Sequence, residues 1–129
     1  MTIRHVNPDG LHHSPAFSQA VVVEQPQKTI YVGGQNGVDA DGQLVGPTLG
    51  EQSVQAFRNL AAILESEGAT LADVVHWRIA VVDGQPIEEG LGAFQKVWDP
   101  ADPPPAITVH FVAGLTPGAL VEIDAVAVV

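Results

Sequence analysis

The sequence predicts an α+β fold: one mixed sheet with two helices on one face. Strand-like and helical stretches follow one another in the order β-β-β-α-β-α-β-β. Only two stretches carry apolar residues at helical spacing, and two helices of that length can cover only one face of a sheet. A chain of 129 residues is long enough for one domain and too short for two, so we expect a single domain over residues 1–129.

The first third of the chain is predicted to hold three strands. Residues 3–6 form a short candidate edge strand. Residues 17–23 and 29–33 are expected to pair as a hairpin through the turn at residues 24–28. The stretch 33–46, "GGQNGVDADGQLVG", is rich in glycine and aspartate and contains an Asn-Gly turn dipeptide, which indicates a loop.

The middle of the chain carries both predicted helices. In residues 50–67 apolar side chains recur at helical spacing, and Gly68 is well placed to end the helix. Residues 74–82 are expected to form a buried strand. Pro86 then opens a second helix whose apolar stripe runs to Trp98, before "DPADPPP" ends it.

Two predicted strands, residues 106–113 and 119–128, close the chain, and the turn-rich link "GLTPG" between them is of hairpin length. In the last strand apolar residues occupy most positions of both faces, although Glu122 and Asp124 interrupt one of them. Since the helices cover only one face of the sheet, the other needs a different cover. The simplest cover is another copy of the chain, so we predict an obligate homo-oligomer.

Composition and charge narrow the possible functions. The chain has no cysteine, which excludes disulfides, thiolate nucleophiles, and zinc-thiolate or iron–sulfur centres. Its formal net charge of −10 repels phosphate backbones, so nucleic-acid binding is disfavoured. The N-terminus does not resemble a leader and no run of eighteen apolar residues occurs. We expect no membrane span, no secretion and a cytoplasmic location.

The sequence contains no motif for a cofactor or a metal. GxGxxG, GxxxxGKS/T and GxSxG are all missing. His12 and His13 are adjacent and His5 lies nearby, but adjacent side chains diverge and a metal site needs three or four convergent ligands, so we interpret them as surface residues. "DADG" at 39–42 lacks the glutamate that a calcium loop carries at its twelfth position. We predict neither a cofactor nor a metal.

Glu122 is the first candidate functional residue. A carboxylate within the apolar stretch "LVEIDAV" is costly to bury unless it is paired, hydrogen-bonded or protonated. Such residues serve as acids, bases or water-positioning groups. A salt-bridged carboxylate, or one that lines an oligomer interface, is the alternative reading.

His110 and Arg78 are two further candidates. If the last two strands pair regularly, His110 lies opposite Glu122 on the same face, as an imidazole oriented by a carboxylate. A one-residue bulge would move Ile107 to that face instead. We favour a structural sheet histidine. Arg78 lies among valines in a strand and needs a carboxylate across a subunit interface or an anionic ligand, and a structural ion pair is favoured.

Four stretches resemble the RidA/YjgF family, which is also called endoribonuclease L-PSP or reactive intermediate deaminase. They are residues 14–23, 30–45, 51–75 and 104–128, so the resemblance covers nearly the whole chain. The last stretch is similar to the family signature of proline-alanine-arginine, a strand, Leu-Pro and Val-Glu-Ile-Glu-Ala. The resemblance implies a chorismate-mutase-like (YjgF-like) fold and a homotrimer with clefts between subunits. Such a trimer would account for the second apolar face of the sheet.

The resemblance also implies a chemistry. The best-known family members hydrolyse reactive enamines and imines, such as 2-aminoacrylate and its tautomer, to 2-keto acids and ammonia. Their signature arginine clamps the substrate carboxylate, and their signature glutamate acts at the position of the attacking water. Carried onto this sequence, Glu122 is the catalytic glutamate, and Gly33, Gly34 and Gln35 flank the cleft. Ile107 stands where the arginine belongs.

That departure changes the expected substrate. An aliphatic side chain cannot replace a bidentate charge-assisted clamp, and one such hydrogen bond contributes on the order of 1.5 to 3 kcal/mol. Phe17 stands where the family usually has tyrosine, and together with Ile107 and Val109 it makes the predicted substrate-binding pocket more apolar. The pocket keeps its carboxylate and backbone donors but loses its anion anchor. We therefore expect 2-aminoacrylate and 2-iminobutanoate deaminase activity to be weak or absent.

Two functions remain open at this stage. The first is a RidA-like homotrimer whose cleft between subunits takes a neutral small molecule, with an imine or enamine other than the usual 2-imino acid as candidate substrate and Glu122 positioning water. The alternative is a non-catalytic trimer that binds a small molecule or a partner and has lost the deaminase activity. Ribonuclease activity, which an older family name suggests, is disfavoured by the acidic charge and the absence of a basic, aromatic-rich stretch.

Overall fold

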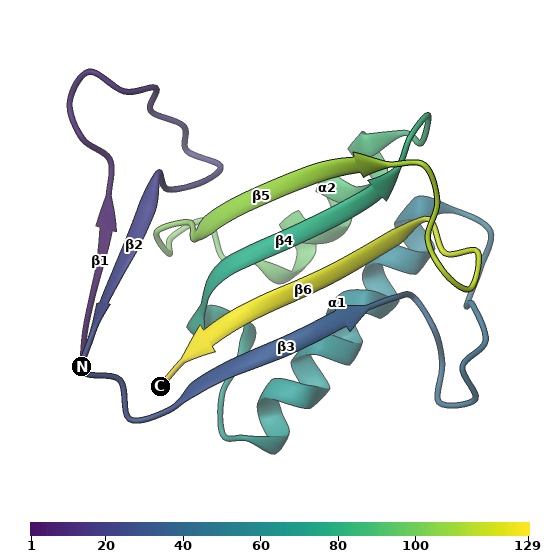
Figure 1. Cartoon of the computed structure of the whole chain (residues 1–129), viewed down its shortest axis with the longest axis horizontal. Coiled ribbons are helices and arrows are strands. Elements are labelled where there is room, and N and C mark those ends of the chain that lie inside the picture. The colour runs from purple at the N-terminus through teal and green to yellow at the C-terminus, as the bar shows by residue number, and fades with distance from the viewer.

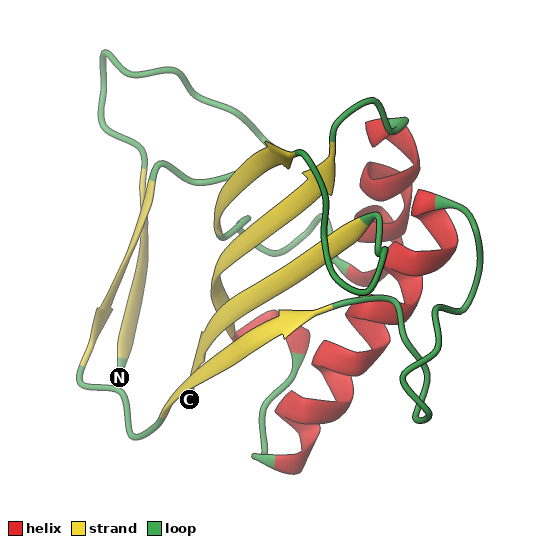
Figure 2. Cartoon of the chain, turned by 45° about the vertical axis from the view of Figure 1, so that its right-hand side comes forward, coloured by secondary structure: helices red, strands yellow, loops and turns green.

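The computed structural model describes all 129 residues and confirms the α+β class and the predicted order of helices and strands. Four strands form a mixed sheet in the spatial order β3 (Thr29–Gln35), β6 (Val121–Val128), β4 (Val74–Val82) and β5 (Ala106–Val112). Strands β4 and β5 run parallel, and the other neighbours are antiparallel. Both helices, α1 (Leu49–Ser66) and α2 (Ile87–Val97), lie on one face of this sheet (Figures 1 and 2).

The predicted hairpin between the last two strands is wrong, because β4 lies between β5 and β6. The chain leaves β4, crosses over through α2 and returns as β5 in the parallel direction, which is the usual path for a strand–helix–strand unit. Strand β6 then enters the middle of the sheet and pairs with β3 on one side and β4 on the other. Its apolar character on both faces is typical of a central strand.

The predicted pairing of the second and third strands is also wrong. Strand β2 (Ala20–Glu24) pairs instead with β1 (Thr2–Val6), and these two strands form a separate ribbon beside the main sheet (Figure 1). The intervening stretch contains Pro26, which has no N–H to donate. The backbone N–H groups of Gln27 and Lys28 both donate to the carbonyl oxygen of Val129, at 3.0 and 2.9 Å. The chain therefore joins the C-terminal strand rather than turning back on β2.

Local capping explains why α1 was predictable. Thr48 and Glu51 form a capping box at its start, with the Glu51 N–H donating to Thr48 Oγ1 at 3.2 Å. At its end Gly68 has a φ of 78°, which favours glycine, and the Ala69 N–H donates to the Leu64 carbonyl at 2.9 Å. These bonds fix a helix that begins and ends within one residue of its predicted bounds.

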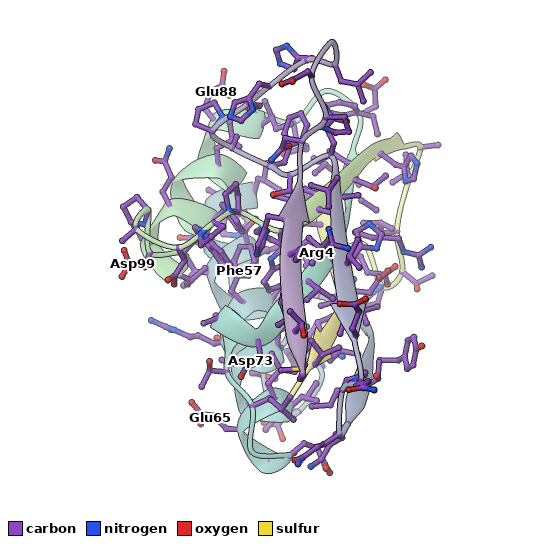
Figure 3. All side chains as sticks on the ribbon, turned by 90° about the vertical axis from the view of Figure 1, so that its left-hand side faces the viewer. Arg4, Phe57, Glu65, Asp73, Glu88 and Asp99 are labelled. Atoms are coloured by element: carbon purple, nitrogen blue, oxygen red, sulfur yellow. The ribbon has the colours of Figure 1, made fainter.

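The core lies between the helices and the sheet. Trp77 of β4 is fully buried and meets Phe57 of α1 edge-on, with 5.4 Å between the ring centroids, while Phe94 of α2 lies 6.2 Å from Trp77. Figure 3 shows Phe57 inside the molecule, whereas Glu65 and Glu88 project outward from the helical layer. Only Ala93 of α2 is fully buried, so α2 is held less closely against the sheet than α1.

Candidate small-molecule site

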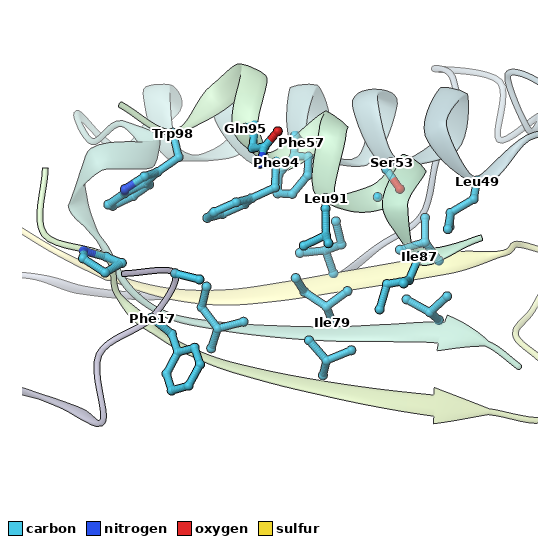
Figure 4. Close-up of a pocket in the computed structure, with 18 of the residues that line it drawn as sticks. Phe17, Leu49, Ser53, Phe57, Ile79, Ile87, Leu91, Phe94, Gln95 and Trp98 are labelled. Carbon is cyan, nitrogen blue, oxygen red and sulfur yellow. The ribbon is translucent and has the colours of Figure 1, made fainter. Parts of the chain in front are cut away.

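An apolar cavity of about 760 Å³ lies between α2 and the helix-covered face of the sheet. Of its 21 lining residues, 14 are hydrophobic, which is the composition expected of a small-molecule site. The residues that define its walls come from α2 and the adjoining loop, from β4 and from β5: Ile87, Leu91, Phe94, Trp98, Ile79, Val81, Ile107 and Val109. Figure 4 shows the helical residues facing the sheet across this space.

Phe17 and Trp98 line the same end of the cavity, Phe17 on the side of the sheet and Trp98 on the side of the helices (Figure 4). The segment that carries Phe17 is tied to the loop before β5, because the Ser18 N–H donates to the Pro105 carbonyl at 3.0 Å and the Ser18 hydroxyl donates to the Pro104 carbonyl. The sequence-predicted substrate residues Phe17, Ile107 and Val109 therefore do come together, as lining of one cavity.

His5 supports the same segment, which corrects its interpretation as a surface residue. Its Nδ1 atom lies 3.0 Å from the Pro104 carbonyl oxygen and 3.2 Å from the Ser18 hydroxyl, and its side chain is half-buried. The neighbouring pair His12 and His13 is exposed, as predicted. No group of three or more histidine, cysteine, aspartate or glutamate side chains is arranged to hold a metal ion.

Glu122 lies on the other face of the sheet. In β6 its neighbours Val121 and Ile123 are buried towards the helices, so the intervening Glu122 points to the face that no helix covers, here called the open face. The side chain is half-buried, and neither of the two ion pairs in the chain involves it. The structure thus favours the reading of Glu122 as an available carboxylate over that of a salt-bridged one within the chain.

Gly34 makes room for the Glu122 side chain. A Cβ atom at Gly34 would lie 2.6 Å from Glu122 Cδ and 2.8 Å from its Cγ, distances too short for any contact. The pairing of β3 with β6 is irregular between Val32 and Gln35, so Gly33 and Gly34 belong to a bulge that bends the edge strand here. The predicted cleft residues Gly33, Gly34 and Gln35 are therefore part of β3 rather than of a loop. Gly34 lies against Glu122, whereas Gln35 pairs with Ile123.

A second, polar hollow of about 450 Å³ occupies the open face next to this bulge, with Tyr31, Gly33, Gly34 and His76 among its lining residues. It also contains Arg78 and Asp124, which form a bidentate ion pair: Arg78 Nε lies 3.0 Å from Asp124 Oδ1, and Nη2 lies 3.1 Å from Oδ2. These hydrogen bonds and the charge of Asp124 raise the pKa of Arg78. The favoured structural ion pair is confirmed, and it forms within one chain.

His110 shares the open face with Glu122 but is not its neighbour. Ala80 of β4 pairs with Glu122 on one side and with His110 on the other, so the two side chains stand two strands apart. That spacing places their backbones roughly 9 to 10 Å apart. The predicted direct opposition of His110 and Glu122 is wrong because it assumed that their strands are adjacent.

One chain does not bring the predicted site together. Ile107 and Val109 line the cavity under α2, whereas Glu122 and Gly34 lie on the opposite face of the same sheet. Sequence reasoning also missed the contribution of α2, because it identified the apolar stripe of this helix without linking it to a cavity. The signal that could have found it is the pair of glycines, Gly90 and Gly92, which leave an 11-residue helix without bulk at two positions.

The fold and the cavity define a small α+β protein with an apolar cavity beneath its second helix. Residues 10–129 match the family described as Endoribonuclease L-PSP. The chain therefore belongs to the RidA/YjgF family, as the sequence resemblance predicted. Neither helix combines the length and the hydropathy that a membrane crossing would require.

Several relatives are similar over most of their length. The 2-iminobutanoate/2-iminopropanoate deaminase of Rattus norvegicus is 35% identical over 116 residues, which cover 88% of this chain and 80% of the rat protein. The human protein of the same description is 33% identical, with 87% and 79% covered. Among solved structures, the Rid-family protein YyfB of Yersinia pestis, described as of unknown function, has a TM-score of 0.84 at 34% identity and full coverage of both chains. RidA of an Antarctic Psychrobacter has a TM-score of 0.73 at 28% identity, with 98% and 99% covered.

Proposed function

We propose that this protein is a homotrimeric Rid-family hydrolase that converts a neutral imine or enamine to a carbonyl compound and ammonia, in clefts between subunits. The observation that carries the proposal is the division of the candidate site between two faces of one sheet. In a cleft between two copies, the apolar cavity of one chain can meet the open face of the next, so that Ile107 and Glu122 serve one substrate.

The rim of the cavity supports contact with a second copy. Leu91 and Val109, which line the cavity, are 55% and 42% exposed, and Phe111, two residues after Val109 in β5, is 56% exposed. Contiguous apolar surface of this kind is a mark of a binding or subunit interface. The open face adds the half-buried Val126 and the exposed ring of Tyr31, which need a cover of the same kind.

Glu122 supplies the chemistry in this proposal. Its carboxylate accepts a hydrogen bond from a water molecule and holds that water against the carbon of the C=N bond. The water oxygen bonds to this carbon while a proton passes to nitrogen, and the resulting carbinolamine then breaks its C–N bond. The sum is R₂C=NH + H₂O → R₂C=O + NH₃, and the carboxylate is regenerated.

The charges near the site favour a neutral substrate. Ile107 offers no partner for a substrate carboxylate. Arg78 is already occupied by Asp124, with which it forms three hydrogen bonds. Without an anchor of this kind, an anionic 2-imino acid would meet a net charge of −10 and an apolar wall. The names of the deaminase relatives support the reaction type, while Ile107 argues for a different substrate.

Ammonia release tests the proposal. Wild type, Glu122→Gln and Glu65→Gln are compared on freshly generated neutral ketimines and on 2-aminoacrylate. We expect release from neutral ketimines, little or none from 2-aminoacrylate, and a loss of about a hundredfold or more in Glu122→Gln. Glu65, an exposed residue of α1, is the matched control. Full activity of Glu122→Gln would remove that residue from the mechanism.

The second candidate function is a trimer that binds a small molecule without turning it over. The observation in its favour is again Ile107. A family member without the arginine that clamps the substrate can lose the reaction and still keep a cavity that binds a small molecule. It predicts that no imine of the panel is hydrolysed faster with the protein than without it. Light scattering tests what both functions share: a species of monomer mass at micromolar concentration would contradict the trimer.

A further inference from the structure

The cavity beneath α2 is lined by one buried polar side chain that has no hydrogen-bond partner. Ser53 of α1 is 99% buried, and its hydroxyl makes no hydrogen bond within the protein. Ser53 is among the residues that line the cavity, whereas Trp77, whose indole nitrogen is the other unpartnered buried group, is not. In Figure 4 Ser53 lies near one end of the cavity, and Phe17 and Trp98 lie at the other. A buried hydroxyl without a partner is uncommon and calls for one.

Gly90 lies beside this buried hydroxyl and places no side chain next to it. A Cβ atom at Gly90 would lie 3.8 Å from Ser53 Oγ and 3.8 Å from Leu49 Cδ2, so any larger residue would stand between the two helices in front of Ser53. Gly90 itself lines the cavity. The space therefore ends at a single hydrogen-bonding group surrounded by aliphatic and aromatic side chains.

The shape and size of the cavity indicate a larger ligand than a short 2-imino acid. Its volume of about 760 Å³ lies within the range of drug-sized ligand sites. The stacked rings of Phe94 and Trp98, 6.1 Å apart and 7° from parallel, form a flat aromatic wall at the end opposite Ser53. Flat apolar groups pack well on such a wall.

From these observations we propose that the substrate is a hydrophobic ketimine or enamine, of aryl-alkyl size and without a carboxylate, that carries one hydrogen-bonding oxygen at the end remote from its C=N bond. This inference rests on the proposed function for the reaction, and it adds the substrate class. The body of the substrate fills the cavity, its remote oxygen pairs with Ser53, and its C=N bond lies at the opening, where a second copy presents Glu122.

Stable ketones, which correspond to the products, test the substrate class without turnover. The probes are 4-phenylbutan-2-one, its para-hydroxyl derivative, and 4-phenyl-2-oxobutanoate, which carries a carboxylate. Binding is measured by calorimetry and by tryptophan fluorescence, with Trp98→Phe used to assign the signal to the cavity. We expect both neutral ketones to bind, the para-hydroxyl compound about fivefold more tightly, and the carboxylate at least tenfold more weakly.

Variants of Ser53 and of the neighbouring Gly90 test whether the Ser53 hydroxyl causes the fivefold gain in affinity. The fivefold gain is expected to disappear in Ser53→Ala and to persist in Ser66→Ala, which removes an exposed hydroxyl from the same helix. Gly90→Ala provides a second route, because its methyl group screens Ser53 Oγ while it raises helix propensity. A gain that survives both Ser53→Ala and Gly90→Ala would overturn the assignment of Ser53.

The failures of the two proposals are distinguishable. If no neutral ketone binds, or the carboxylate binds equally well, the substrate class proposed here is wrong, and Glu122-dependent release of ammonia from small neutral imines would still support the proposed function. If the neutral ketones bind as expected and no imine is hydrolysed, the cavity assignment stands and the hydrolase does not.

Discussion

The two faces of the main sheet present different chemical groups to a ligand. The helix-covered face carries an apolar cavity whose walls contain no ion pair and whose one buried, unpartnered polar side chain is that of Ser53. The open face carries Glu122, the Arg78–Asp124 pair and two histidines, His76 and His110, in a shallow polar hollow and along the strands beside it. The proposed binding surface and the proposed reactive group, Glu122, are thus separated by the thickness of one sheet. Under the proposed function, one chain alone cannot bring both to the same substrate, and a second copy is required.

The largest effect is expected from a substitution beneath the helix-covered face. Trp77→Ala removes a fully buried ring that contacts Phe57 and Phe94, and should cost about 3 to 5 kcal/mol of unfolding free energy. Trp98→Ala, at the half-buried cavity wall, should cost less than half as much. Urea unfolding followed by circular dichroism at equal protein concentration measures both. Equal losses of unfolding free energy in Trp77→Ala and Trp98→Ala would mean that the cavity wall stabilises the fold as much as the core does, and would contradict the distinction between them.

The next largest effect is expected on the rate of ammonia release, through Glu122, the proposed reactive group of the open face. Gly34→Ala places a methyl group where the Glu122 carboxyl now lies, so the side chain must move by about an ångström or more. Because a shift of this size can cost about a hundredfold in rate, ammonia release should fall by that order. Gly114→Ala, which meets nothing within 4 Å, is the control. Unchanged release in Gly34→Ala would show that the orientation of Glu122 does not matter.

An arginine at position 107 tests whether the two faces work together. Ile107→Arg introduces a carboxylate clamp into the cavity, and hydrolysis of 2-aminoacrylate should rise at least tenfold. Ile107→Met, of similar length and uncharged, should show no such gain. The measurement is the rate of 2-aminoacrylate disappearance with each variant. If Ile107→Arg folds and gains nothing, Ile107 and Glu122 do not meet at one substrate.

The smallest expected effect is the difference in coupling energy between the two ion pairs of the chain. Lys28–Glu67 is about half-exposed in both partners, and a double-mutant cycle should give a coupling below about 1 kcal/mol. The bidentate Arg78–Asp124 pair lies on the face that a second copy is proposed to cover, so its coupling should be the larger of the two. Thermal unfolding of the single and double variants measures both. Equal couplings would indicate that the open face stays in water.

The sequence predicted what local chemistry determines. Helix α1 was placed within one residue of its ends, because Gly68 and the apolar spacing act over a few residues. The alternation along β6 placed Glu122 on the opposite face from Val121 and Ile123, and the structure shows that the helices cover the face of Val121 and Ile123. The family followed from whole stretches of residues, and the match over residues 10–129 confirms it.

The order of the strands in the sheet and the presence of the cavity could not be predicted from local sequence patterns. Nothing in "GLTPG" reveals that β4 lies between β5 and β6, since a link of hairpin length can also step over a strand. The same limit misassigned His110, whose distance from Glu122 depends on that order. An apolar stripe such as that of α2 looks the same whether it fills a core or lines a cavity, because only the opposing surface decides which it does.

The proline run before β5 bears on how the specificity of this protein could change over evolutionary time. Pro104 and Pro105 hold their φ angles fixed and present carbonyl oxygens to Ser18 and His5, so the anchor of the Phe17 segment is stiff. Residues 14–17 lie just outside that anchor and make few bonds to the rest of the chain. Substitutions there can reshape one end of the cavity while the sheet, and with it the position of Glu122, stays intact. The fold thus separates the segment that shapes one end of the cavity from the sheet that positions Glu122, an arrangement in which the proposed recognition can change one residue at a time.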